Sequence, residues 1–171
     1  LIEFADRPLK IGSFSAASNV TGLKTDVDEV AALLHQYDAL SFWDYAAAAP
    51  YVSIDMNPIN RACSKDAVFL SPHKFVGGPG TPGVLIVKKQ LLKNSVPVSP
   101  GGGTVLYVTP VDHQFITDHE RREEGGTPAI VESIRAGLVF KLQQAVGTEL
   151  IENLEASFKE RALRQWKTNK N

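Results

Sequence analysis

Short apolar runs alternate along the chain with polar and glycine-containing segments, and this pattern predicts both strands and helices. Four runs bounded by turn-forming residues predict strands at 10–15, 40–43, 67–70 and 84–87. The second and third runs are mostly apolar, which is typical of buried strands. From Thr25 to about Asp38, apolar residues recur at helical spacing. Because Thr25 with Asp28 resembles a capping box, an amphipathic helix is predicted here.

The last third of the chain predicts two further helices. Thr127 is a suitable N-cap with Pro128 at the first helical position, and Gly147 is a suitable stop. Apolar residues mark one face of this first helix: Ile130, Ile134, Leu138 and Leu142. A second helix is expected to begin near Thr148, and its apolar stripe is expected to be core or domain-contact surface: Ile151, Leu154, Phe158, Ala162 and Trp166.

Polar segments separate these elements. Residues 101–103 and 112–126 predict a long irregular connection of the kind that often carries function. One strand, a helix, three strands and then helices is an order typical of an α/β fold, with a mostly parallel sheet flanked by helices. Ligands of such sheets bind at the carboxyl ends of strands. Polar residues that follow the predicted strands are therefore candidate site residues: Asn19, Asp44, Ser71, His73 and Lys74.

Composition narrows the functional classes. The chain has 171 residues and 43% hydrophobic content, which is enough for one globular domain with an apolar core. A net charge of −1 provides no basic field for nucleic acid or a membrane surface. The single cysteine, Cys63, excludes an intrachain disulfide and favours a reducing intracellular compartment. The four histidines show no paired spacing with carboxylates, so no metal site is expected.

The segment 71–83 has the most distinctive sequence, Ser-Pro-His-Lys-Phe-Val-Gly-Gly-Pro-Gly-Thr-Pro-Gly. A lone lysine after a strand is ordinarily a solvated surface charge, and a lone aspartate such as Asp44 ordinarily ends a strand or caps a turn. The glycine-rich part is not a nucleotide-phosphate loop, because it lacks the Lys-Ser/Thr ending and leads into a strand. A function for Lys74 therefore depends on the motifs around it.

This segment resembles the cofactor-lysine motif of class V aminotransferase-like enzymes, the group that contains cysteine desulfurases, selenocysteine lyases and several transaminases. Four other segments match family motifs in the same order: 18–22, 44–50, 101–103 and 122–128. Together the five motifs span roughly residues 11–147, and this ordered set is more specific than any one motif. The resemblance implies the large domain of a fold-type-I pyridoxal-phosphate transferase, incomplete at both ends.

The resemblance also implies roles for three residues near the cofactor ring. Lys74 is expected to form the internal Schiff base with pyridoxal 5'-phosphate and to move protons at the α-carbon of the substrate. Asp44 is expected to keep the pyridine nitrogen protonated, because a nearby carboxylate favours the charged form. Asn19 is expected to lie near the ring oxygen and the substrate.

Three further residues are implied as phosphate contacts. Ser71 and His73 supply hydroxyl and imidazole donors beside the lysine. Thr127 is expected to reach the phosphate of the neighbouring subunit from a helix N-terminus, where free N–H groups favour anions. The resemblance therefore implies a homodimer.

Two departures from the family pattern bear on the reaction. Ala47 stands where relatives in the desulfurase branch generally carry a glutamine that binds the ring oxygen. Cys63 precedes the lysine motif, whereas the desulfurase cysteine belongs to a later segment. The expected function is a pyridoxal-phosphate enzyme acting on an amino acid, of cysteine desulfurase or selenocysteine lyase type. An aminotransferase or epimerase of the same family is one alternative, and a non-catalytic fragment or divergent relative is another.

The chain is expected to be part of a longer protein, because its only methionine is the internal Met56. Residues 1–147 are expected to be part of the cofactor-binding large domain, and residues 148–171 a helix leading toward a C-terminal small domain. This part alone is expected to be inactive. Its partners are expected to be an amino-acid substrate and a second subunit, without nucleic acid or membrane. The expected location is cytoplasmic, with a mitochondrial one left open.

Overall fold

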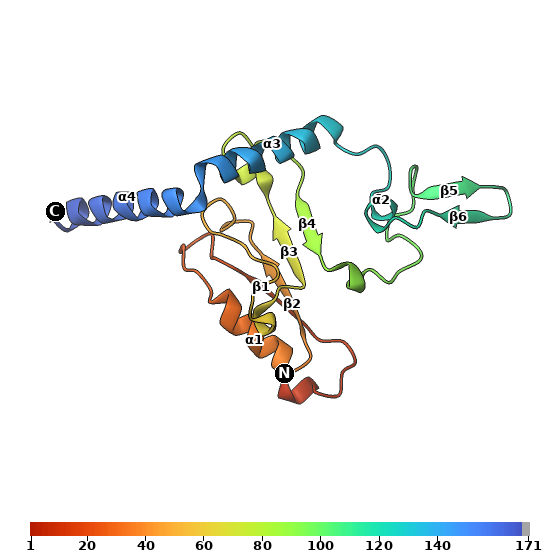
Figure 1. Cartoon of the computed structure of the whole chain (residues 1–171), viewed down its shortest axis with the longest axis horizontal. Coiled ribbons are helices and arrows are strands. Elements are labelled where there is room, and N and C mark those ends of the chain that lie inside the picture. Colours follow the sequence, from red (N-terminus) through yellow and green to blue (C-terminus); the bar gives the residue numbers. More distant parts are fainter. Residues whose placement is uncertain (169–171) are drawn as a thin grey trace.

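A computed structural model describes residues 1–168 and contains a four-stranded sheet (Figure 1). Its strands lie in sequence order: β1 (Ile11–Ser15), β2 (Leu40–Asp44), β3 (Ala67–Leu70) and β4 (Val84–Val87). The first three are parallel, and β4 runs antiparallel to β3. The mostly parallel sheet and its four strands are therefore confirmed, each strand within a residue of its predicted ends.

The register of the sheet sets the place of the site. Ser15, Asp44 and Phe69 are partners across β1, β2 and β3. Just beyond them, the Ala16 N–H donates to the Asp44 carbonyl at 2.8 Å and the Tyr45 N–H to the Phe69 carbonyl at 2.9 Å. Because the three strands are parallel, the segments that follow them leave the sheet at one edge.

Helix α1 (Val27–Gln36) packs against this sheet, and its cap differs from the prediction. The Asp26 carboxylate, rather than Thr25, accepts the Glu29 N–H at 3.0 Å. The Thr25 hydroxyl is instead directed to the Ser15 carbonyl, to which it donates at 2.8 Å. The predicted capping box was therefore wrong by one residue, and the helix is shorter than predicted at both ends.

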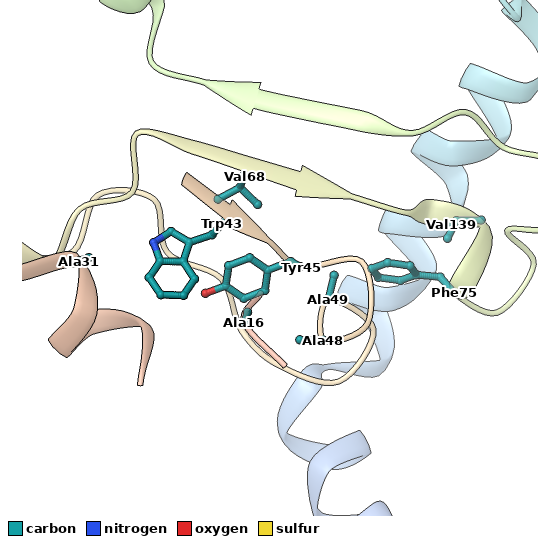
Figure 2. Packing of buried hydrophobic residues seen from close by; sticks show 9 residues of the cluster. All are labelled: Ala16, Ala31, Trp43, Tyr45, Ala48, Ala49, Val68, Phe75 and Val139. Carbon is teal, nitrogen blue, oxygen red and sulfur yellow. The ribbon is translucent and has the colours of Figure 1, made fainter. Parts of the chain in front are cut away.

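The core lies on one face of the sheet (Figure 2). Trp43 and Val68 are completely buried there, and Ala31 of α1 packs against them. The cluster continues through Tyr45 to Phe75. Successive strand residues point to opposite faces, so the intervening residues lie on the other face of the sheet. That face is largely open, with Ile11, Phe69 and Leu85 exposed. The prediction of buried strands, made for β2 and β3, therefore holds for their core-facing residues but not for Phe69.

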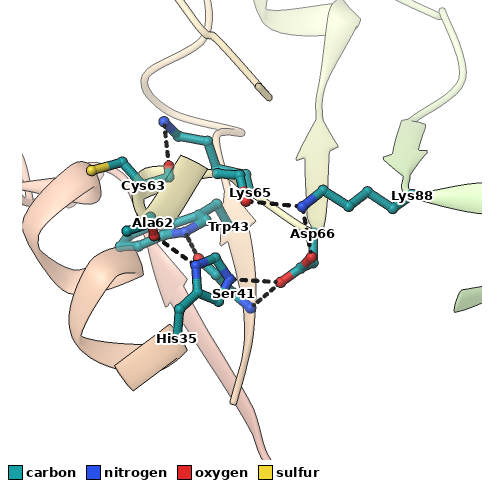
Figure 3. A network of polar contacts seen from close by, with 9 residues as sticks. His35, Ser41, Trp43, Ala62, Cys63, Lys65, Asp66 and Lys88 are labelled. Atoms are coloured by element: carbon teal, nitrogen blue, oxygen red, sulfur yellow. Dashed lines mark hydrogen bonds and ion pairs between the residues drawn. The ribbon is translucent and has the colours of Figure 1, made fainter. Parts of the chain in front are cut away.

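A buried carboxylate ties the opposite edge of the sheet together (Figure 3). Asp66, directly before β3, accepts the Ser41 N–H at 2.9 Å and contacts His35 Nε2 at 3.1 Å. Lys88 Nζ, directly after β4, lies 3.0 Å from the other carboxylate oxygen. Burial opposes the charged form of Asp66, but hydrogen bonds from Ser41, His35 and Lys88 outweigh it and lower its pKa. Asp66 thus joins α1, β2, β3 and β4 away from the candidate site.

Two long helices follow: α3 (Ile130–Val146) and α4 (Thr148–Thr168). Gly147 ends α3 with a φ of 85°, which confirms the predicted stop. The predicted start was wrong: the N-cap is Ala129, and the Ser133 N–H makes the first helical bond to its carbonyl at 2.8 Å. A helical backbone conformation is unfavourable for Thr127, because this residue precedes a proline. The last three residues of the predicted C-terminal helix lie outside the described residues.

The apolar stripe predicted for α3 faces away from the sheet. Ile130, Ile134, Leu138 and Leu142 are between 48% and 63% exposed. The buried residues of the helix are instead the smaller Ala136 and Val139, and α4 has no fully buried residue. In Figure 1, α4 extends away from the rest of the molecule.

The predicted irregular connection was wrong in part. It contains a hairpin of β5 (Val105–Val108) and β6 (His113–Phe115), followed by the short helix α2 (His119–Glu123). The Thr109 hydroxyl accepts the Asp112 N–H at 2.8 Å and fixes the hairpin turn. Four 3-10 turns complete the described part of the chain: η1 (Ile2–Phe4), η2 (Arg61–Cys63), η3 (Pro72–Lys74) and η4 (Lys89–Leu91). None of the helices within residues 1–168 is long and apolar enough to cross a membrane.

Candidate active site

An open cavity of about 610 Å³ lies where the segments after β1, β2 and β3 meet the start of α4. Its size falls within the range of ~300–1,000 Å³ that is typical of small-molecule sites. The charged and amide- or hydroxyl-bearing residues that line it come from three separate segments: Ser18, Asn19, Lys24, Lys74, Glu152 and Glu155. Asn19 and Lys74 are two of the residues predicted from the sequence, so the structure brings both to one cavity.

Lys74 combines a fixed backbone with an exposed side chain. It is the last residue of η3, and its N–H donates to the Ser71 carbonyl at 3.0 Å. On either side of it, Pro72 and Phe75 point into the interior and are buried, with Phe75 only 6% exposed. Within residues 1–168, no carboxylate lies within ion-pairing distance of the Lys74 amine. The amine is therefore accessible on a rigid turn.

The glycine-rich segment after Lys74 folds tightly against η3. A Cβ atom on Gly78 would overlap the Pro72 carbonyl oxygen, so this position requires glycine. Gly77 and Gly80 have φ angles of 81° and 83°, which other residues rarely adopt. The segment thus anchors the lysine turn before it enters β4.

Helix α3 supports the site from behind. Its Arg135 guanidinium donates to the Pro79 carbonyl, and the Gln143 side-chain amide donates to the Pro50 carbonyl at 2.6 Å. One helix therefore holds both the glycine-rich segment and the Asp44–Pro50 segment.

A closed loop after β1 carries Asn19. The backbone of Ala17 bridges that of Lys24, and the Ser18 N–H donates to the Leu23 carbonyl at 3.0 Å. The Ser18 hydroxyl also accepts the N–H groups of the two residues that follow Asn19, each at 3.2 Å. This loop presents Asn19 and Lys24 to the same cavity.

The other predicted residues lie near the cavity without lining it. Asp44 ends β2 with an exposed carboxylate whose Oδ1 accepts the Ala46 N–H at 2.7 Å. Because its neighbour Trp43 points into the core, Asp44 points to the opposite face of the sheet. Ser71 and His73 belong to the same turn as Lys74. They lie at the same end of the sheet as Lys74, but they do not line the cavity.

Thr127 is far from this site within the chain. It is exposed and precedes α3, whereas Phe75 contacts α3 through Val139 and Phe140. The distance along α3 from its start to these two residues is roughly 15 Å at 1.5 Å per residue. The glycines before Thr127 pack instead against the triglycine motif, with the Gly126 N–H donating to the Gly102 carbonyl at 2.9 Å. The 101–103 and 122–128 motifs therefore contact each other, away from the cavity that contains Lys74.

Three charged residues of the cavity were missed by sequence reasoning: Lys24, Glu152 and Glu155. Lys24 Nζ lies 2.8 Å from Glu152 Oε1. The hydrogen bond from Lys24, together with its charge, lowers the pKa of the Glu152 carboxyl. The pair is 128 positions apart in sequence, and no local pattern signals that α4 begins beside the loop after β1.

Comparison with known proteins points to one family. The sequence profile of the family described as Aminotransferase class-V matches residues 5–171. A probable cysteine desulfurase of Halalkalibacterium halodurans is 32% identical over 154 residues, which cover 90% of this chain and 36% of that protein. A cysteine desulfurase of Synechococcus elongatus is 32% identical over 146 residues, which cover 85% of this chain and 22% of that protein.

Solved structures agree with the sequence relatives. A cysteine desulfurase from Thermococcus onnurineus NA1 has a TM-score of 0.78 at 25% identity, covering 91% of this chain and 38% of that one. A cysteine desulfurase from Escherichia coli has a TM-score of 0.72 at 24% identity, covering 82% of this chain and 34% of that one. These likenesses confirm the predicted fold, that of fold-type-I pyridoxal-phosphate enzymes.

The chain spans about a third or less of the length of these relatives. Class V aminotransferases, cysteine desulfurases among them, depend on pyridoxal phosphate. Because the family profile matches nearly the whole sequence, the chain belongs to the class-V aminotransferase family of pyridoxal-phosphate-dependent enzymes.

Proposed function

We propose that this chain provides the cofactor lysine and part of the active site of a pyridoxal-phosphate enzyme that acts on an amino acid, of the cysteine desulfurase type. The observation that carries the proposal is the place of Lys74. Its accessible amine stands on a rigid turn, in a cavity at the carboxyl ends of parallel strands. Relatives named as cysteine desulfurases support the reaction type.

The residues present fit the cofactor. The cavity is large enough for a small aromatic phosphate ester, and the neighbouring polar groups are an amine, a carboxylate, a hydroxyl and an imidazole. When bound, pyridoxal phosphate supplies an aldehyde carbon for amines and a ring that accepts electron density from the α-carbon of a substrate. The residues of the chain must then hold it, orient it and move protons.

The proposed roles follow from the chemistry of each side chain. Lys74 would hold the cofactor covalently through its amine, with loss of water, and the same amine, when free, would carry a proton to or from the substrate α-carbon. Asp44 stabilises the protonated pyridine nitrogen, and its hydrogen bond from the Ala46 N–H orients the carboxylate. Asn19 donates to the ring oxygen or to the substrate.

Phosphate contacts are proposed for Ser71, His73 and Thr127. The first two belong to the turn that carries Lys74. Thr127 lies beyond the reach of Lys74 in the same chain, and this distance supports a contact with the phosphate bound by a second subunit. We therefore propose a homodimer in which each subunit supplies Thr127 to its partner.

The division of the chain is also a proposal. Residues 1–147 form part of the cofactor-binding domain, and the segment 148–171 leads toward a small domain. The exposed apolar side chains of α4 support a contact with further protein, for they have little to pack against in residues 1–168: Leu150, Leu154, Phe158 and Trp166. A cytoplasmic location accords with this proposed enzyme.

One observation favours a second candidate reaction. Ala47 lines the cavity with a methyl group, where the desulfurase branch generally carries a glutamine amide. Aminotransferase or epimerase chemistry on the same scaffold uses Lys74 and Asp44 equally and does not need that amide. Selenocysteine lyase chemistry belongs with the first candidate, because it shares the desulfurase pattern.

The covalent attachment is tested by adding pyridoxal phosphate to the purified chain, reducing with borohydride, and mapping the modified lysine by mass spectrometry. We expect modification at Lys74 and a visible absorption band that Lys74→Ala abolishes. Lys141→Ala, a change at an exposed lysine of α3, should leave both unchanged. An unmodified chain supports a non-catalytic piece, and modification mainly at another lysine refutes the role of Lys74.

A further inference from the structure

Arg122 of α2 is a buried charge at the end of the molecule opposite α4 (Figure 1), and it is only 6% exposed. Its guanidinium donates to the Asn94 carbonyl at 2.5 Å and to the Ile116 carbonyl at 3.3 Å. It also donates to His119 Nδ1 at 2.7 Å, and this nitrogen must accept because arginine has no acceptor. One side chain therefore joins the connection after β4, the residue after β6 and the start of α2.

A buried arginine is unfavourable unless it is fully paired, and Arg122 is not. The carboxylate within ion-pairing distance, that of Glu123, lies 4.0 Å from Arg122 Nε. This Nε has no hydrogen-bond partner within residues 1–168. Apolar residues of similar size are often equally stable in such positions. We therefore look for the role of Arg122 in the arrangement of the segments that it joins.

The segment 94–126 has few other buried contacts. Its buried residues are Pro97, Thr104 and Arg122. In the described chain, the core cluster shown in Figure 2 has no member within this segment. A segment without an apolar core of its own depends on polar contacts to keep one arrangement, and Arg122 makes three of them.

Two hydrogen bonds extend this contact along the chain. The Glu123 carboxylate accepts the Val98 N–H at 3.1 Å. The Gly126 N–H donates to the Gly102 carbonyl at 2.9 Å. Gly126 directly precedes Thr127, so the buried arginine and these two bonds fix the backbone up to the residue proposed to bind phosphate.

We propose that Arg122 is the positioning residue of Thr127, because it holds the segment 94–126 in the arrangement that presents Thr127 to a second subunit. This proposal rests on the proposed function, in which Thr127 contacts the phosphate bound by that subunit. Arg122 itself touches neither cofactor nor substrate. Its loss should therefore weaken cofactor binding in the neighbouring subunit and not in its own.

Mixed dimers of differently tagged subunits test this direction. One subunit of each dimer carries Lys74→Ala, so that a single attachment site remains, and its affinity for pyridoxal phosphate is measured from the visible absorption. With Arg122→Met in the Lys74→Ala subunit, we expect about tenfold weaker binding, because a hydrogen bond to a charged group is impaired. With Arg122→Met in the subunit that keeps Lys74, the affinity should not change.

Two further variants sharpen the comparison. Arg121→Met, at the exposed neighbouring arginine, should have no effect in either subunit. Thr127→Ala in the Lys74→Ala subunit should weaken binding as Arg122→Met does, and the two changes together should weaken it no further. Equal weakening by Arg122→Met in both placements overturns the proposal. Weakening only in the subunit that keeps Lys74 also overturns it.

A cofactor-free measurement separates this proposal from the proposed function. Hydrogen exchange of backbone amides is followed by NMR, and Arg122→Met should accelerate it about tenfold or more at Ile116 and Gly126. The amides of β2 and β3 should exchange as in the parent chain. Unchanged exchange at Gly126 refutes the positioning role even if the chain binds cofactor. Faster exchange there, in a chain that neither dimerises nor takes up cofactor, refutes the proposed function while supporting Arg122 as the residue that holds this segment.

Discussion

The ring of Phe75 packs edge-on against the ring of Phe140, with 5.5 Å between centroids and 87° between planes. Phe75 directly follows Lys74, the proposed cofactor lysine, so this contact joins the lysine turn to α3. We expect Phe75→Ala to lower the free energy of unfolding by about 3–5 kcal/mol, because it leaves a cavity in the core. Chemical denaturation measures this loss, and reductive labelling should show less attachment at Lys74.

Two variants control for this change. Phe75→Leu keeps most of the apolar volume and should cost about 1 kcal/mol. Phe4→Ala removes a half-exposed ring at the start of the chain and should stay within about 0.5 kcal/mol. If Phe75→Ala unfolds like Phe4→Ala, the contact with α3 does not stabilise the turn.

Gly78 provides a test of backbone packing beside Lys74. A methyl group there would overlap the Pro72 carbonyl oxygen, so Gly78→Ala must displace η3. We expect a loss of about 1–3 kcal/mol, as for other overpacked sites, together with reduced labelling of Lys74. Gly102→Ala is the matched control, because a Cβ atom at Gly102 meets no atom within 4 Å. Equal stability of the two variants would contradict the close packing at Gly78.

Asp66 should make stability depend on pH in the acid range. The pKa of its carboxyl is lower in the folded chain than in the unfolded one, because Ser41, His35 and Lys88 hydrogen-bond to it and outweigh the opposing effect of burial. Its contribution is therefore complete above the unfolded pKa of about 4 and is lost as the pH falls through the lower folded value. Unfolding by denaturant from pH 7 to pH 2 measures this dependence.

Asp66→Asn should lower stability by about 3 kcal/mol at pH 7, because Lys88 and His35 lose a charged partner. The difference from the parent chain should shrink as the pH falls from about 4 through the lower folded pKa, since protonation of the parent carboxylate then removes the same charge. Asp6→Asn, at an exposed aspartate, should leave the acid dependence almost unchanged. A constant difference between Asp66→Asn and the parent at every pH would refute the assignment.

The exposed stripe of α3 should cause the isolated chain to self-associate. Four large apolar side chains lie in line on this helix, and adjacent apolar surface of this kind tends to be covered by other protein: Ile130, Ile134, Leu138 and Leu142. We expect the double variant Ile134→Lys and Leu138→Lys to shift the chain toward the monomer in light scattering at micromolar concentration. Gln144→Lys adds a charge to the same helix and should not. Unchanged association of the double variant would exclude this stripe as the contact.

Strands and strand-end residues were predictable because their signals are local. Apolar runs bounded by turn-forming residues located all four strands of the sheet, and the rule for parallel sheets then placed Asn19 and Lys74 together. The start of α1 was predicted wrongly, because Thr25 and Asp26 can both cap a helix. Only the fold shows that the Thr25 hydroxyl bonds to Ser15 and that Asp26 is the cap. The hairpin was missed because both strands are short and β6 has only one apolar residue among its three.

The other residues of the site could not be predicted, because they depend on contacts between residues that are far apart in sequence. Lys24 and Glu152 meet only because α3 returns the chain to the carboxyl edge of the sheet before α4 begins. The stripe of α3 was predicted to be amphipathic, but periodicity does not identify what covers an apolar face. Ala136 and Val139 face the core instead, since small side chains allow the helix to approach the lysine turn.

A single residue links the helix that supports the Lys74 turn to the helix that lines the cavity. Gly147 lies between α3, which is bonded to the segments around Lys74, and α4, which carries Glu152 and Glu155. The angle between these helices therefore sets the distance from the glutamates to Lys24. With φ at 85°, any other residue at this position would be strained and would tend to change that angle. The width of the cavity between Lys24 and these glutamates is thus set at one glycine, which lies outside every motif that predicted the site.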